Sequence, residues 1–291
     1  MSVVRGIIAR NLRLFFRDRM NVFFSLMSGI ILFVLYTLFL AGLQADGLAA
    51  QFPDATDAQI RAFVDSWMFS GIVLLTTVTS GLGAMSRLVE DSASGRFADF
   101  LVSPIRRGQL VLGYLISAFT IALIMTAVVL ALSVLYLGIV DGLWLEPRRV
   151  LASALVMALC ALAFTALGAF VVTFVRTTGA FSAFATVVGT VLGFIAGAYI
   201  PIGSLPATVG DVVNALPFSQ GGMLLRREFT AQSLEGLTDV PEATESVRLF
   251  YGVDIYVGDA EIFPWVAAAV LAVVAVGFTA LAAGRMSSRI R

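Results

Sequence analysis

The sequence contains no lysine and no histidine, and these absences exclude several classes of catalytic site. A Walker A loop needs a lysine to reach the phosphates, while zinc-peptidase motifs and Ser-His-Asp triads need a histidine. Cys160 is the single cysteine, so the chain can form neither an internal disulfide nor a cysteine cluster for a metal. We therefore expect a chain without a catalytic site of its own and without a bound cofactor.

Charged residues are also scarce. They make up 13% of the 291 residues, and hydrophobic residues make up 59%, whereas roughly a quarter of the residues of a soluble domain are charged. The mean hydropathy of +0.95 agrees with this imbalance. The apolar residues form long runs and not the alternating segments of about ten residues that build a transmembrane β-barrel. The composition therefore predicts a helical membrane protein.

A transmembrane helix needs about 20 mainly apolar residues, and six stretches of the chain meet this requirement. We predict an all-α integral membrane protein that forms a single domain over residues 1–291 and has six transmembrane helices. The predicted spans cover about residues 20–45, 64–86, 108–139, 149–175, 178–200 and 262–284.

Three further segments do not cross the membrane in this prediction. Residues 1–19 place arginines on one helical face and apolar residues on another, which predicts an amphipathic helix on the inner surface, in contact with anionic membrane lipids. Residues 201–227 contain three prolines and, up to Leu225, a single charged residue, and they are too short to cross the membrane twice. They predict a re-entrant helical hairpin on the outer side. The acidic stretch 228–261 then predicts a folded outer loop.

The distribution of the arginines sets the predicted orientation. With both termini in the cytoplasm, the inner segments carry thirteen arginines and four acidic residues, and the outer segments carry six arginines and fifteen acidic residues. The net charges are then +9 inside and −9 outside, as the positive-inside rule requires. The exclusive use of arginine over lysine points to a GC-rich bacterial genome, so we predict a location in the bacterial plasma (inner) membrane.

The loop 87–107 between the second and third predicted spans contains most of the cytoplasmic acidic residues. Phe97, Phe100 and Leu101 have the spacing of one helical face, and Pro104 would end that helix. Apolar side chains that face the cytoplasm need cover. They either lie on the inner leaflet or the helix bundle, or they dock into a groove of a cytosolic partner.

This loop resembles that of the type-2 ATP-binding-cassette (ABC-2 type) exporter permeases. The resemblance rests on the acidic pair Glu90-Asp91, on Gly95 and on the run from Phe100 to Ile105 with its Ser-Pro pair. The N-terminal helix, six spans and proline-rich hairpin extend it over essentially the whole chain. It implies that the loop is a coupling helix seated in a cleft of the ATPase subunit. The residues of this contact would be Glu90, Asp91, Gly95, Arg96, Phe97, Phe100, Leu101, Ser103 and Pro104.

The resemblance also implies partners. A complete exporter would contain two copies of a separate ABC ATPase subunit, which bind ATP and Mg²⁺, and a second permease subunit in a homodimer or heterodimer. No nucleic acid is expected as a partner. The substrate would be a hydrophobic drug-like, lipid-like or peptide molecule. The alternatives are export of a polysaccharide or glycolipid, and an immunity or sensing complex without bulk transport. A carrier driven by ions is disfavoured because no charged residue lies in the middle of a span.

Two sets of small and polar residues stand out within the predicted spans. A stripe of small residues with a period of four predicts close helix packing in the fifth span, in the same subunit or across a dimer. A cluster of hydroxyl residues in the second span either bonds to backbone carbonyls one turn earlier or lines a substrate path. In the resembling family, the path lies where spans one, two and five of both subunits meet. The small residues are Ala185, Gly189, Gly193 and Gly197, and the hydroxyl residues are Thr76, Thr77, Thr79 and Ser80.

Overall fold

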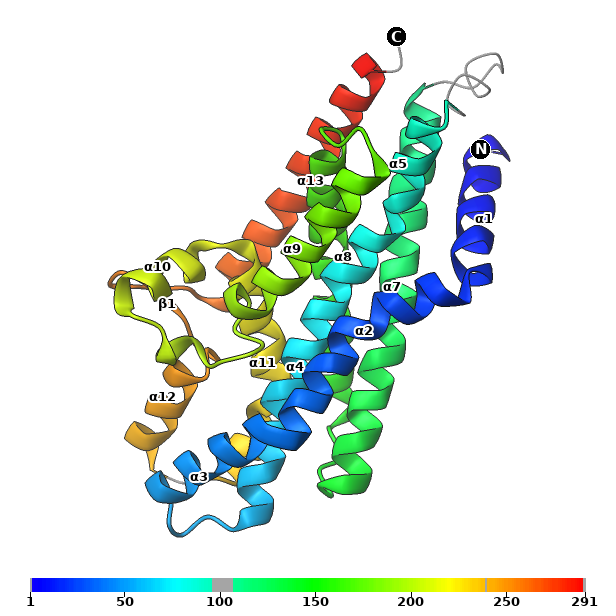
Figure 1. The fold of residues 1–291 in the computed structure, drawn as a ribbon. Coiled ribbons are helices and arrows are strands. Elements are labelled where there is room, and N and C mark those ends of the chain that lie inside the picture. Colours follow the sequence, from blue (N-terminus) through cyan, green and yellow to red (C-terminus); the bar gives the residue numbers. More distant parts are fainter. Residues whose placement is uncertain (1, 96–106, 239, 290–291) are drawn as a thin grey trace.

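The computed structural model describes residues 2–95, 107–238 and 240–289, which form long helices joined by short loops (Figure 1). Before the first gap the elements are α1 (Ser2–Arg17), α2 (Arg19–Leu35), the π-helix η1 (Tyr36–Leu40), α3 (Ala41–Gln51), α4 (Asp57–Ala84) and α5 (Ser86–Ala93). After it they are α7 (Arg107–Val140), α8 (Pro147–Val172), α9 (Thr178–Ile195), the 3₁₀ turn η2 (Ile202–Ser204), α10 (Ala207–Ala215), α11 (Pro217–Glu235), α12 (Pro241–Phe250), the strands β1 (Tyr256–Val257) and β2 (Ala260–Glu261), and α13 (Pro264–Arg289).

Six helical segments in the described ranges are long and apolar enough to cross a membrane, and each overlaps one predicted span. This confirms the prediction of an all-α integral membrane protein. The segments are Arg19–Gln51, Asp57–Ala93, Gly108–Val140, Pro147–Val172, Thr178–Ile195 and Pro264–Met286.

The first two of these segments extend beyond the uncharged runs that predicted them. Asp46 lies within α3, and Arg61 and Asp65 lie within α4. Thr56 begins α4 with a capping box, because its side chain accepts a hydrogen bond from the Gln59 amide and the Gln59 side chain accepts one from the Thr56 amide. A helix satisfies its own backbone hydrogen bonds whether or not a side chain is charged, so the helices continue past the charges.

The fifth span ends earlier than predicted, at Ile195 and not near residue 200. Gly197 follows it with a φ of +62°, a left-handed conformation that favours glycine. The Ala198 amide donates to the Gly193 carbonyl at 2.8 Å, and the Gly197 amide donates to the Phe194 carbonyl at 3.0 Å. These two bonds form a Schellman motif, which stops the helix and turns the chain back along it.

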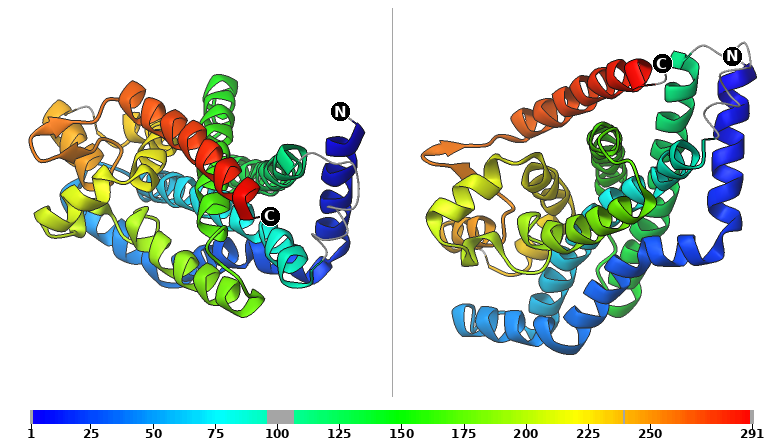
Figure 2. Two further views of the ribbon diagram at one scale, coloured as in Figure 1. Left: turned by 90° about the horizontal axis from the view of Figure 1, so that it is seen from above. Right: turned by 45° about the horizontal axis from the view of Figure 1, so that its top comes forward.

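Both chain termini lie at the same end of the molecule, as an even number of spans requires (Figure 1). We call this the termini end and the other the far end. Helix α1 stands beside the rest of the bundle and packs along α7 (Figure 2). Its buried face includes Ile7 and Asn11. The Asn11 side chain donates to the Ser117 hydroxyl at 3.0 Å, and Gly113 leaves the space that Ile7 fills. The position of α1 on a membrane surface stays a prediction.

The buried apolar side chains form two clusters. The larger one surrounds α4, the central helix, of whose most apolar 18 residues 89% are buried. The smaller one lies toward the termini end and joins α1, α5, the first half of α7 and the end of α13. The termini end therefore has a core of its own, in which α1 and α5 share neighbours.

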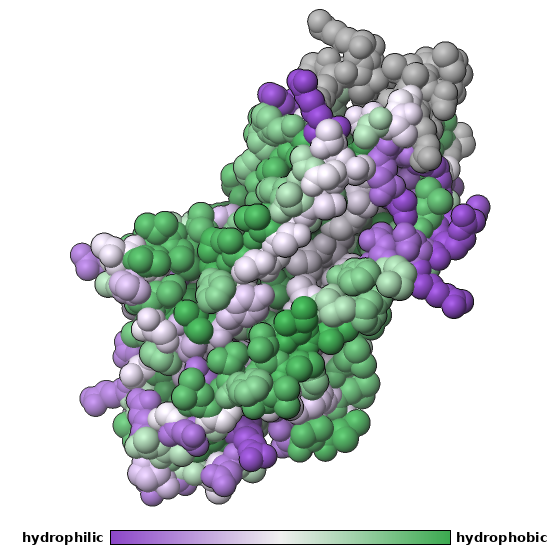
Figure 3. Space-filling view, viewed as in Figure 1, coloured by the Kyte–Doolittle hydropathy of each residue, from purple (hydrophilic) through white to green (hydrophobic). Residues whose placement is uncertain are grey.

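Residues 201–261 form short helices and a β-hairpin at the side of the bundle away from α1 (Figures 1 and 2). Pro217 occupies the first turn of α11, where the missing N–H costs nothing. Helix α11 packs against α4, α8 and α13 and continues to Glu235, beyond the end of the predicted hairpin at residue 227. The depth of α10 and α11 in a membrane stays a prediction. Apolar surface covers much of the bundle in this view (Figure 3).

Candidate functional site

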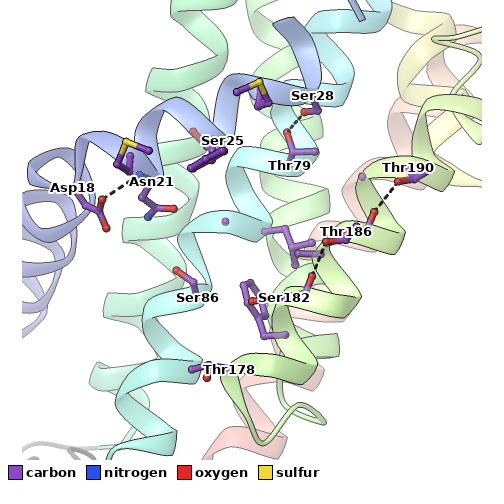
Figure 4. Close-up of a pocket in the computed structure, with 18 of the residues that line it drawn as sticks. Asp18, Asn21, Ser25, Ser28, Thr79, Ser86, Thr178, Ser182, Thr186 and Thr190 are labelled. Atoms are coloured by element: carbon purple, nitrogen blue, oxygen red, sulfur yellow. Dashed lines mark hydrogen bonds between the residues drawn. The ribbon is translucent and has the colours of Figure 1, made fainter. Parts of the chain in front are cut away.

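A groove with a volume of about 910 Å³ runs between α2 and α9, and α4 forms its floor (Figure 4). It is therefore bounded by the first, second and fifth spans. The surface over α9 is a pale stripe of intermediate hydropathy between strongly apolar regions (Figure 3). Asp18, Arg87 and Glu90 line the groove at its termini end, and Thr190 and Tyr199 line it at its far end.

The α9 wall carries hydroxyl groups at every fourth residue. The Thr186 hydroxyl donates to the Ser182 carbonyl, and the Thr190 hydroxyl donates to the Thr186 carbonyl, both at 3.0 Å. Each donor is thus satisfied by its own helix, which lets a polar group occupy an apolar span at low cost. The hydroxyl-bearing residues of this wall are Thr178, Ser182, Thr186 and Thr190 (Figure 4). We call this set the hydroxyl ladder.

The opposite wall is mixed in character. Asn21, Ser25 and Ser28 of α2 line it, and the Ser28 hydroxyl donates to the Thr79 hydroxyl of α4 at 3.3 Å. Phe24, which is 59% exposed, lies among these polar groups. Apolar lining is contributed by Met20, Phe24, Met27, Ile31, Leu82, Phe181 and Tyr199. The groove is therefore amphiphilic along its whole length and fits a molecule with both apolar and hydrogen-bonding groups.

Arg87 bridges two carboxylates at the mouth of the groove. Its Nη1 lies 2.7 Å from Glu90 Oε2, and its Nη2 lies 3.3 Å from Asp18 Oδ2. Asp18 also caps α2 by accepting a hydrogen bond from the Asn21 amide. Both carboxylates are more than one-third exposed, and exposed ion pairs of this kind contribute 1 kcal/mol or less. The bridge therefore connects the start of α2 to α5 and can open at small cost.

Asp91 has a different environment from its neighbour Glu90. Its side chain is only 2% exposed and points into the core of the termini end. Arg10 Nη1 and Nη2 donate to its two oxygens at 2.8 and 3.0 Å, and the Tyr114 hydroxyl donates to it as well. The hydrogen bond to Asp91 raises the pKa of the Arg10 guanidinium, so this contact stays charged. In this structure Asp91 joins α5 to α1 and α7.

The remaining residues of the predicted coupling contact are only partly within the described ranges. Gly95 follows α5 with a φ of +75°, so a glycine suits the turn that leads out of this helix. Arg96, Phe97, Phe100, Leu101, Ser103 and Pro104 lie outside the described residues. Contact of this loop with an ATPase stays a prediction.

Of the four hydroxyl residues predicted for a substrate path, the structure places only Thr79 in the groove wall. Thr76, Thr77 and Ser80 are fully buried within the bundle. The Thr77 hydroxyl donates to the Val73 carbonyl at 2.7 Å, and a Cβ on Gly29 of α2 would lie 3.0 Å from Thr76 Oγ1. In this conformation these three residues belong to the contact surfaces of α4.

The stripe of small residues is divided among three environments. Ala185 and Gly189 line the groove, and a Cβ on Gly189 would meet no described atom within 4 Å. Gly193 lies under the ring of Tyr199, and Gly197 lies beyond the end of the helix. Packing of this stripe against another helix therefore stays a prediction that concerns a second subunit.

Sequence reasoning missed two features of this site. The hydroxyl ladder was visible in the sequence as a period of four in α9, the same period that marked the small residues. The pairing of Arg10 with Asp91 joins residues 81 positions apart, and no local pattern indicates it.

The comparisons with known proteins agree with this architecture. A family model described as ABC-2 type transporter matches residues 3–227, which is more than half of the chain. That match covers α1, the first five spans and the groove between α2, α4 and α9. No curated protein was found that matches the chain. The chain therefore belongs to the ABC-2 type transporter family and is a multi-pass membrane permease component of an ABC transporter.

Proposed function

We propose that this chain is the permease subunit of an exporter and that the groove between α2, α4 and α9 forms its half of the substrate path. The groove itself carries the proposal, because polar and apolar groups from the first, second and fifth spans line it together. The Thr186 and Thr190 hydroxyls donate within their own helix, but their oxygens can still accept hydrogen bonds from a substrate or a second subunit. The matching substrate is amphiphilic: a drug-like, lipid-like or peptide molecule.

ATP hydrolysis belongs to a partner in this proposal. The 291 residues contain no lysine, so they cannot form a Walker A site. Family membership implies an ABC ATPase partner. We propose two copies of that ATPase, which bind ATP and Mg²⁺, and a second permease subunit that faces the groove. The loop after α5 would contact the ATPase, since α5 leads from the central helix α4 to the termini end.

We further propose that the termini end faces the cytoplasm of a bacterial cell. The arginine-rich segments gather at this end and the acidic segments at the far end, which satisfies the positive-inside rule. The outer leaflet would then lie near the level of α10 and α12.

Reconstitution tests the proposal directly. The chain is purified with its ABC ATPase and placed in proteoliposomes, and ATP-dependent movement of a fluorescent lipophilic dye and of a fluorescent phospholipid is measured. We expect one of these probes both to move and to stimulate ATP hydrolysis. Hydrolysis that no probe, peptide or glycolipid stimulates, with no movement of any of them, would favour the sensing complex over the exporter.

Simultaneous replacement of Glu90 and Phe97 by alanine is expected to uncouple the ATPase. Glu90 holds Arg87 at the groove mouth, and Phe97 supplies apolar surface to the predicted coupling helix. The double variant should insert normally but lose most of its substrate-stimulated ATP hydrolysis. Co-purification and ATPase assays measure this effect. Full transport by the double variant would contradict the coupling role.

A further inference from the structure

The chain folds back on itself after the groove-lining helix α9. The amides of Ala198 and Tyr199 both donate to the Gly193 carbonyl, at 2.8 and 2.9 Å. This doubled contact brings the residue after the turn to the level of the last helical turn of α9. Tyr199 therefore lies beside the groove, although it follows the helix by several residues.

The ring of Tyr199 occupies a seat that only glycine provides. A Cβ on Gly193 would overlap the ring carbons of Tyr199. The Phe194 ring supports the same ring edge-on, with centroids 5.0 Å apart and planes at 86°. In this position Tyr199 lines the far end of the groove, next to Gly189 and Thr190 of α9.

The backbone that carries the ring is fixed to the rest of the bundle. Arg226 of α11 is fully buried and donates hydrogen bonds to the carbonyls of Ala196 and Gly197. On the other side, Gly71 of α4 lets Ala198 approach so closely that a Cβ on Gly71 would lie 3.0 Å from that of Ala198. A turn held between α11 and α4 gives the ring a rigid base, so the ring can move only by rotating its side chain away from Gly193.

We propose that Tyr199 is the gate at the far end of the groove. With its ring on Gly193, Tyr199 lines the far end of the groove. In the assembled complex the ring in this position blocks passage toward the far side of the membrane, and a substrate passes only when the ring leaves it. This inference rests on the proposed function, because it assigns a role within the same path. It also explains the glycine at position 193 by the space that the Tyr199 ring needs, and not by packing against another helix.

The structure offers a matched pair of variants that separates these two reasons. Gly193→Ala would push the ring off its seat, whereas Gly189→Ala, one turn away on the same stripe, meets open space. If the stripe serves only to pack against another helix, both changes should act alike. If Gly193 is the seat of the gate, only Gly193→Ala should open the groove.

The opening is measured by cysteine labelling of the full permease–ATPase complex in intact cells. A cysteine replaces Thr186 on the groove wall, and a membrane-impermeant maleimide is added from the far side. Cys160 is completely buried, so the chain without the added cysteine serves as the blank. We expect labelling of the added cysteine to rise several-fold with Tyr199→Ala and with Gly193→Ala, and to stay unchanged with Gly189→Ala and Tyr199→Phe.

Equal labelling of the Tyr199→Ala variant and its parent would overturn the gate. Equal increases in labelling with Gly193→Ala and Gly189→Ala would contradict the role of Gly193 in holding the Tyr199 ring and would support helix packing. If Gly193→Ala does not yield a folded complex, Tyr199→Ala decides alone, since it only removes atoms. Labelling needs neither substrate nor ATP hydrolysis. A complex that transports nothing but shows the expected labelling would therefore refute the exporter function and not the gate.

Discussion

Replacement of Asp91 by alanine is expected to lower the free energy of unfolding by about 3 kcal/mol, because it leaves the positive charge of Arg10 without its bidentate partner in a partly buried site. The Tyr114 hydroxyl loses its acceptor at the same time. Since Asp91 joins α5 to both α1 and α7, we expect α1 to detach from the bundle. The rate of substrate-stimulated ATP hydrolysis should fall as well, although Asp91 itself faces the interior of the bundle.

Chemical unfolding in mixed micelles and limited proteolysis after Arg5 or Arg13 measure these two effects. Glu90→Ala is the matched control, because Glu90 is the adjacent acid, its side chain is 38% exposed and its described ion pair is with Arg87. That variant should lose less than 1 kcal/mol. In a double-mutant cycle with Arg10→Ala, the two losses should be strongly non-additive. Additive losses would mean that Asp91 and Arg10 do not stabilise the protein through each other.

The predicted spans and the described helices agree because crossing a membrane requires a length and an apolar composition that can be read directly from a sequence. About 20 apolar residues are needed to cross, and every backbone polar group must be satisfied internally. The ends of the helices follow other rules. The capping box at Thr56 begins α4 before its apolar run, and the left-handed Gly197 ends α9 while its apolar run continues.

The candidate site was less accessible to sequence reasoning than the fold. The period-four stripe in α9 predicted close helix packing, but in the structure Ala185 and Gly189 line a groove of the single chain and Gly193 accommodates an aromatic ring. In a sequence, a small residue that lines a groove or lies under an aromatic ring looks the same as one that packs against another helix. The acidic pair Glu90-Asp91 likewise reads as one motif, yet the fold turns one carboxylate to the groove mouth and the other into the core. Which side a residue faces depends on neighbours that are far away in the sequence.

Helix α9 depends on few contacts with its own chain. Only 17% of its 18-residue span window is buried, against 89% for α4. At its far end, beside the buried Leu192, α9 is connected to α11 through the turn at residues 196–198. Arg226 is the side chain that connects this turn to α11, and Gly252 of the outer segment is its third acceptor, at 3.4 Å.

Arg226→Met is therefore expected to have the largest effect of any single arginine replacement outside the termini end. Methionine fills much of the volume, but the buried carbonyls of Ala196, Gly197 and Gly252 lose their donor, and each unsatisfied group costs about 1–3 kcal/mol. We expect a loss of roughly 3 kcal/mol or more in the free energy of unfolding. The turn that carries Tyr199 should loosen as well, so labelling in the groove from the far side should increase.

The neighbouring arginine provides the control for this experiment. Arg227 is 31% exposed and pairs with Asp254, which keeps Arg248 as a second partner when Arg227 is removed. Arg227→Met should therefore cost less than 1 kcal/mol and leave the labelling unchanged. If both variants lose the same stability, the burial of Arg226 has no special consequence. If Arg226→Met is destabilised but its groove stays closed, the ring of Tyr199 keeps its seat without the arginine, and Gly71 with the Schellman turn is sufficient to hold it.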